Sequence, residues 1–208
     1  MSDITLRPDQ MTAEAIRKEE YRANNLKFAT WLFLASEVVL FTMMIAGYIL
    51  FRLNEPEIVK QAHAGLSILL ISANTFVLLA SSWAMVMGLR AVKKGSNQGG
   101  FRWFMLTAAL GLIFLFGQYY EYMELAHLSV TLGFDTDALA GWGMRFYAPT
   151  FFHGAHVAIG VIWALLVARR TRRGDYSRYR TAGIEMFGLY WHFVDVAWIF
   201  LFTLIYLV

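Results

Sequence analysis

The 208-residue sequence contains no cysteine, and this absence removes several kinds of site at once. Without thiols there is no disulfide, no thiolate-held zinc, no iron–sulfur cluster and no haem attached through cysteine. A metal would have to be held by carboxylates or by the five histidines. Charged residues are also scarce, at 16% against 58% apolar residues, with a mean hydropathy of +0.49. Such a composition excludes an ordinary soluble domain and indicates one helical membrane domain.

Residues 1–27 lack the apolar core and the small-residue cleavage site of a secretory signal. They form a polar stretch with five basic and five acidic residues. We expect this segment to be retained and to lie outside the bilayer, with residues 28–208 forming the membrane domain. None of the later connections is rich enough in Pro, Gly or Ser to mark a further domain boundary.

Five segments reach the length of about 20 apolar residues that a helix needs to cross a bilayer. They run over Phe28–Phe51, Ala64–Leu89, Trp103–Glu124, Phe146–Ala168 and Ile184–Val208. The sequence therefore predicts an all-α integral membrane bundle of five transmembrane helices.

The basic residues alternate between the two sides of this expected bundle. Fifteen of the 18 Lys and Arg residues fall in the N-terminal segment and in the second and fourth connections. The other three are Arg52, Lys60 and Arg145. Because cytoplasmic loops retain positive charge, this bias predicts a cytoplasmic N-terminus and an external C-terminus. The scattered placement indicates membrane topology and no nucleic-acid partner, although the run that begins at Arg169 could also meet anionic lipid or an acidic partner.

Polar side chains inside the apolar segments fall into two layers, at about 12 to 18 Å and about 22 to 27 Å from the cytoplasmic ends of their helices. The first layer holds Glu37, His156, His192 and Asp195; the second holds Gln118, His153 and Glu121, the last approaching the outer headgroups. Three pairs among them are spaced i, i+3 and so share a helix face. We expect these stripes to face one another as a structural polar cluster. Six Ser, Thr and Asn residues of the second segment are expected to hydrogen-bond between helices.

Two other kinds of site remain open for these residues. Transmembrane histidines can hold haem, and a single haem between His156 and His192 is geometrically conceivable. Against this, His153 and His156 share one face and cannot be opposite ligands of one haem. An independent transporter or proton channel is disfavoured because the sequence has no inverted repeat and no pair of helices broken by Gly or Pro.

Glu37 stands alone at its depth on an otherwise apolar helix. It is either a protonated acid satisfied by a neighbouring group or a proton-exchanging group, and burial alone does not separate these alternatives.

Four stretches carry a family resemblance: FLASEVVLF (Phe33–Phe41), GQYYEY (Gly117–Tyr122), FHGAHVAIG (Phe152–Gly160) and YWHFVDVAWIFLF (Tyr190–Phe202). Together they resemble subunit III of haem-copper respiratory oxidases, in the shorter five-helix form that lacks two N-terminal helices. The resemblance implies a non-catalytic subunit of a proton-pumping terminal oxidase in a bacterial-type inner membrane. Such a subunit packs on subunit I, binds phospholipid, and supports proton uptake and the durability of the active site.

The resemblance also implies where the chemistry lies. Haem and copper belong to subunit I, with none in this chain, and the partners are other oxidase subunits, membrane lipids and a larger respiratory supercomplex. Glu37 corresponds to the family's carbodiimide-reactive carboxyl, whereas the residues matching Gln118, Glu121, His153, His156, His192 and Asp195 are structural or lipid-facing and bind no metal. The motifs favour a cytochrome c oxidase, with a quinol oxidase or nitric oxide reductase partner as the alternative.

Overall fold

The computed structural model describes residues 13–63, 66–127, 141–177 and 180–207, and every regular element in them is helical. The helices are α1 (Ala13–Asn54), α2 (Pro56–His63), α3 (Ile68–Lys93), α4 (Asn97–His127), α5 (Trp142–Arg173) and α6 (Ala182–Phe202), with a final π-helical turn, η2 (Thr203–Leu207). Five of them, α1, α3, α4, α5 and α6, are long and apolar enough to cross a membrane. This confirms the prediction of an all-α bundle with five spans.

The helices extend beyond the apolar segments that predicted them. The 42-residue α1 would be about 63 Å long, twice the thickness of the hydrocarbon layer. It begins at Ala13, inside the N-terminal polar segment, because backbone hydrogen bonds continue through polar residues that hydropathy does not count. The short α2 was not predicted, since eight residues are too few for a span.

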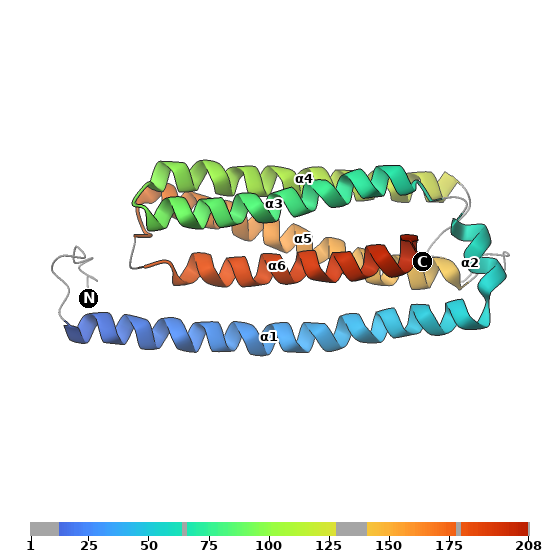
Figure 1. Cartoon of the computed structure of the whole chain (residues 1–208), viewed down its shortest axis with the longest axis horizontal. Coiled ribbons are helices and arrows are strands. Elements are labelled where there is room, and N and C mark those ends of the chain that lie inside the picture. Colours follow the sequence, from blue (N-terminus) through green and yellow to red (C-terminus); the bar gives the residue numbers. More distant parts are fainter. Residues whose placement is uncertain (1–12, 64–65, 128–140, 178–179, 208) are drawn as a thin grey trace.

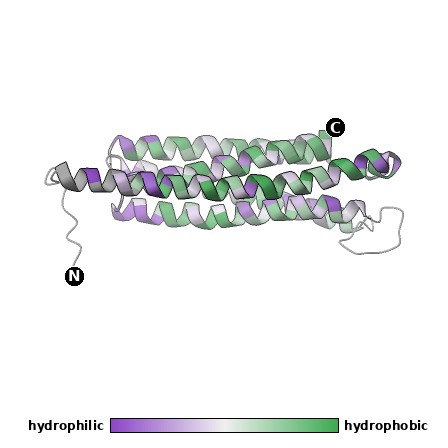
Figure 2. Cartoon of the chain, turned by 90° about the horizontal axis from the view of Figure 1, so that it is seen from below, coloured by the Kyte–Doolittle hydropathy of each residue, from purple (hydrophilic) through white to green (hydrophobic). Residues whose placement is uncertain are grey.

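The five spans form one bundle (Figure 1). The α3–α4 and α4–α5 pairs pack along their lengths, and α6 touches α1, α3 and α5. Helix α1 lies against α5 and α6, away from α3 and α4 (Figure 1). The start of α1 shares one end of the bundle with the α3–α4 turn, while α2 and the C-terminus lie at the other. Hydrophobic residues fill the middle of the bundle, and hydrophilic ones gather at its ends (Figure 2).

Two tryptophans of α6 fill the core between the other helices. Trp191 is fully buried, and a Cβ atom added to Gly111 of α4 or Gly160 of α5 would overlap its ring. The small residues therefore let the helices close around the indole. The Nε1 atoms of Trp191 and Trp198 donate to Ser81 Oγ at 3.0 Å and Thr75 Oγ1 at 2.9 Å on α3. These bonds confirm that small polar residues of this span link helices.

Charged side chains join three helices at the end where α1 begins. The carboxylate of Glu185 on α6 pairs with Lys27 of α1 and lies 2.9 Å from Lys93 Nζ of α3. Both lysines belong to the group expected on one side of the membrane. The fold thus brings residues from three segments to the same end, as the alternation of the charges requires.

Candidate functional site

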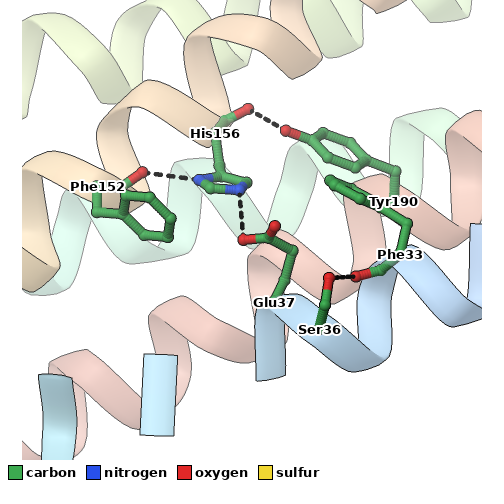
Figure 3. A network of polar contacts seen from close by, with 6 residues as sticks. All are labelled: Phe33, Ser36, Glu37, Phe152, His156 and Tyr190. Atoms are coloured by element: carbon green, nitrogen blue, oxygen red, sulfur yellow. Dashed lines mark hydrogen bonds and ion pairs between the residues drawn. The ribbon is translucent and has the colours of Figure 1, made fainter. Parts of the chain in front are cut away.

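Glu37 of α1 faces His156 of α5 near the middle of the bundle (Figure 3). The two residues are 8% and 7% exposed, and Glu37 Oε2 lies 3.2 Å from His156 Nε2. This is an ion-pair distance, but the two groups lack the alignment of a direct hydrogen bond. Sequence reasoning placed both residues at the same depth, and the structure brings them into contact.

The other ring nitrogen of His156, Nδ1, determines the orientation of the ring and which nitrogen carries a proton. His156 Nδ1 lies 2.8 Å from the carbonyl oxygen of Phe152, which can only accept, so Nδ1 carries a proton. The Tyr190 hydroxyl donates to the His156 carbonyl oxygen at 2.9 Å and holds α6 against this turn of α5 (Figure 3). Nε2 is thereby left toward Glu37.

This geometry permits two forms of the pair without net charge. A carboxylic acid can face a neutral imidazole, or a carboxylate can face an imidazolium, with one proton on either side of the 3.2 Å gap. Aromatic rings surround the pair: the Phe41 and Phe152 centroids lie 5.6 and 4.6 Å from that of His156. In such apolar surroundings a neutral pair avoids the cost of an isolated buried charge.

Gln118 and Glu121 of α4 form a second group with the C-terminal turn. Gln118 Nε2 donates to Glu121 Oε2 at 2.6 Å, and the Tyr206 hydroxyl of η2 donates to the same oxygen at 2.8 Å. Glu121 is 1% exposed. The carboxyl of Glu121 is therefore enclosed by polar partners inside the chain, and its nearness to the outer headgroups stays a prediction.

His153 lies one turn before His156 but points between other helices. It is fully buried, with its ring centroid 4.8 Å from that of Trp198 on α6 and 5.6 Å from that of Phe114 on α4. Neither ring nitrogen has a hydrogen-bond partner in the part of the chain that the structure describes. The contacts of His153 are those of an aromatic core residue.

His192 and Asp195 of α6 face α3. Ser82 Oγ lies 2.5 Å from His192 Nδ1 and also lies beside the Asp195 carboxyl. Asp195 is 4% exposed, and neither of its oxygens is aligned for a hydrogen bond within the described ranges.

The sequence led us to expect that the polar stripes would face one another in a single cluster. In the structure they form separate groups. The stripe on α4 faces the C-terminal turn and the stripe on α6 faces α3. On α5, His153 and His156 diverge by about 60° around the helix and meet different neighbours. His156 is directed at α1 and His192 at α3, so they do not approach as ligands of a common haem. Among the described residues, no group of three or more His, Cys, Asp or Glu side chains could hold a metal ion.

Sequence reasoning missed the two tyrosines that complete these groups, Tyr190 and Tyr206. Both lie in the last apolar segment and were counted as hydrophobic. A tyrosine inside a span carries a hydroxyl that needs a hydrogen-bond partner, and this property could have marked both residues as members of the polar groups. The partners themselves depend on how the helices pack and are not coded by spacing within one segment.

Comparison with known proteins gives consistent matches over nearly the whole chain. The family model described as "Cytochrome c oxidase subunit III" matches residues 11–208. The chain is 40% identical to "Cytochrome c oxidase subunit 3" of Synechocystis sp. over 181 residues, which cover 86% of this chain and 74% of that protein. It is 38% identical to the protein of the same name from Thermostichus vulcanus, over 85% of this chain and 84% of that one. A "Probable cytochrome c oxidase subunit 3" of Nocardia farcinica is 33% identical, with 90% of each chain covered.

Proposed function

The chain belongs to the cytochrome c oxidase subunit III family, and from this premise we propose that it is the non-catalytic accessory subunit of a proton-pumping terminal oxidase. As a multi-pass membrane protein of this family it is part of an oxidase complex and associates with other oxidase subunits. The observation that carries the proposal is the family match across residues 11–208, which includes all five spans.

In this role the chain holds no redox centre, and haem and copper reside in subunit I. The surface supports such an assembly: α1 exposes a series of large apolar side chains, among them Trp31, Val39 and Met43. An apolar helix face of this kind fits either lipid or another transmembrane subunit. We propose that subunit I covers part of it and phospholipid the rest.

The Glu37–His156 pair is the proposed point at which this subunit supports proton uptake and keeps the active site durable. This proposal is supported by the geometry of the pair: Glu37 Oε2 and His156 Nε2 lie 3.2 Å apart in apolar surroundings, and either group can hold the proton between them. The other polar groups are proposed to be structural, because each links helices or packs among aromatic rings. Cytochrome c is the proposed electron donor, in line with the names of the relatives.

We place the complex in a bacterial-type inner membrane, with the N-terminus in the cytoplasm and the C-terminus outside. The support is the charge bias together with the fold, which puts Lys27 and Lys93 at one end of the bundle.

The test is purification of the tagged chain from its native membranes in mild detergent. We expect a larger subunit containing haem and copper to accompany it, and the complex to consume oxygen with reduced cytochrome c. Activity with a quinol alone would show that the complex is a quinol oxidase. Co-purification with a nitric-oxide-reducing complex would assign the chain to that complex instead. A chain that purifies alone with a Soret band that is lost in His156→Ala would replace the proposal by a haem-bearing cytochrome.

A further inference from the structure

A hollow of about 480 Å³ lies at the corner where α1 ends and α2 begins. Its lining is contributed by two residues of α1 and four of α2: Arg52, Leu53, Pro56, Val59, Lys60 and His63. Helix α2 turns away from the axis of α1 at this end of the bundle (Figure 1). The apolar segment Phe28–Phe51 ends one residue before Arg52, so we expect the hollow to lie near the level where hydrocarbon gives way to headgroups.

Positive charge is concentrated at this corner although the sequence keeps it scarce on this side. Of the three basic residues outside the fifteen that define the other side, Arg52 and Lys60 line the hollow. The third, Arg145, has its guanidinium carbon 4.5 Å from the centroid of the Phe51 ring, next to Arg52 in the chain. The positive-inside rule accounts for the small number of these cations and does not account for their meeting at one corner.

His63 is a third basic residue in the lining, beside Arg52 and Lys60. Its Nε2 lies 3.4 Å from the Tyr48 hydroxyl, and the Arg52 charge lies close enough to disfavour a second positive charge on the ring. An anion in the hollow would offset both cations and would allow His63 to accept a proton. The acidic residues nearby, Glu55 and Glu57, are exposed and do not line the hollow.

The other half of the lining is apolar and continues toward the middle of the span. Leu53 is 72% exposed, and Leu50, one turn earlier on α1, is 61% exposed. A ligand with an anionic head and an acyl tail would place the head among the cations and the tail along these leucines. Free phosphate would use the cations alone.

We infer that this hollow binds the phosphodiester headgroup of an anionic phospholipid, with Arg52 and Lys60 neutralising the phosphate and the acyl chain lying along the leucines of α1. Arginine suits this role because its planar guanidinium can donate two hydrogen bonds to one phosphate. The inference rests on the proposed association with lipid and adds to it a location, a headgroup charge and the residues responsible.

The test measures how much phospholipid stays bound to the tagged chain when it is purified together with the subunits that accompany it. The preparation is washed with detergent and re-equilibrated in phosphatidylcholine nanodiscs containing a fixed fraction of phosphatidylglycerol. Lys60→Glu is the first variant, because Lys60 is exposed and its replacement leaves the core intact. Lys60→Arg is the rescue, Arg52→Gln the second loss variant, and Lys94→Gln, an exposed lysine at the opposite end, the matched control.

We expect Arg52→Gln to reduce the bound phosphatidylglycerol roughly fivefold, the change that corresponds to the loss of one cation near a membrane surface, and the charge reversal in Lys60→Glu to reduce it further. Phosphatidylcholine should be unchanged, and Lys60→Arg and Lys94→Gln should match the wild-type chain. Equal phosphatidylglycerol in wild type, Lys60→Glu and Arg52→Gln would overturn the site, while lipid retained elsewhere on the complex would leave the general lipid association standing. If millimolar inorganic phosphate displaces the lipid and binds with the same residue dependence, the ligand is free phosphate and the lipid assignment is wrong.

Discussion

Among single residues, Glu37 differs from the other two carboxyls buried inside the spans in its access to the outside of the chain. Glu121 is 1% exposed and is enclosed by Gln118 and Tyr206, and Asp195 is 4% exposed, whereas Glu37 is 8% exposed on α1, at the edge of the bundle. Its neighbour across the gap, His156, can take or give the proton that Glu37 holds. A small apolar reagent dissolved in the membrane should therefore reach Glu37 more readily than Glu121.

We expect a hydrophobic carbodiimide to modify Glu37 in preference to Glu121. The reagent attacks a protonated acid in an apolar setting, and Glu37 satisfies both conditions in one of the two forms of its pair. Peptide mass spectrometry of the labelled complex measures the selectivity, with Glu37→Gln as the control that should remove the label. Equal modification of both glutamates would contradict the difference in access on which this prediction depends.

The same position separates an accessory role from a catalytic one. Because the chain is proposed to hold no redox centre, Glu37→Ala should leave the assembled complex able to reduce oxygen, while changing proton uptake or the number of turnovers before inactivation. Oxygen consumption is followed in complexes matched for haem content. Complete loss of oxygen reduction in a fully assembled variant would show that Glu37 is catalytic.

His63 gives the lipid hollow a dependence on pH. Burial, and then the nearby Arg52, lower its pKa below the usual 6.5, while the Ile205 carbonyl raises it in part. His63 is thus neutral at pH 7 and gains charge only as the pH falls below its lowered pKa. The other charged or titratable groups beside His63 are Arg52, Lys60 and Tyr48. Retention of phosphatidylglycerol should therefore rise as the pH falls below this lowered pKa, and His63→Gln should abolish the rise. An identical pH profile in wild type and His63→Gln would show that His63 does not face the headgroup.

At the scale of one element, α5 carries two glycines with opposite surroundings. A Cβ atom on Gly160 would overlap the Trp191 ring, which is fully buried and cannot move away cheaply, whereas a Cβ on Gly154 meets nothing within 4 Å. Only the first glycine is required for close approach of α5 and α6.

Gly160→Ala should destabilise the chain by about 1 to 3 kcal/mol, the usual cost of overpacking a core. Gly154→Ala on the same helix should be neutral or slightly stabilising, since alanine is the better helix former. The fraction of each variant that survives heating as a monodisperse species measures the difference. A Gly160→Ala variant as stable as Gly154→Ala would mean that α5 and α6 do not close on Trp191 as described.

The elements were predictable to different extents for physical reasons. Hydropathy located the five spans because each must present apolar residues to hydrocarbon over a fixed length. It could not locate α2, whose residues meet the interface, or the π-helical turn that aims Tyr206 at Glu121. Spacing placed Glu37 and His156 at one depth but could not pair them, since which helices are neighbours depends on packing such as that of Trp191 between two glycines. Because the neighbours of each helix were unknown, the three i, i+3 pairs were expected to form one cluster. In the structure each pair meets different neighbouring helices.

For the whole molecule, the open question of orientation has a direct test. The fold sets the α3–α4 turn and the link from α5 to α6 at the end where Glu185 joins Lys27 and Lys93. Since basic residues are retained in the cytoplasm, that end should be cytoplasmic and the lipid hollow should face outward. Reporter fusions after Lys94 and Arg173 should be active as cytoplasmic reporters, and a fusion after Asp137 should be active only as an external one. A fluorescent protein and a phosphatase fused at each site provide paired readouts, so that a silent fusion is distinguished from a misplaced one. The reverse pattern at any two of the three sites would invert the molecule and would move the hollow and its anionic lipid to the cytoplasmic leaflet.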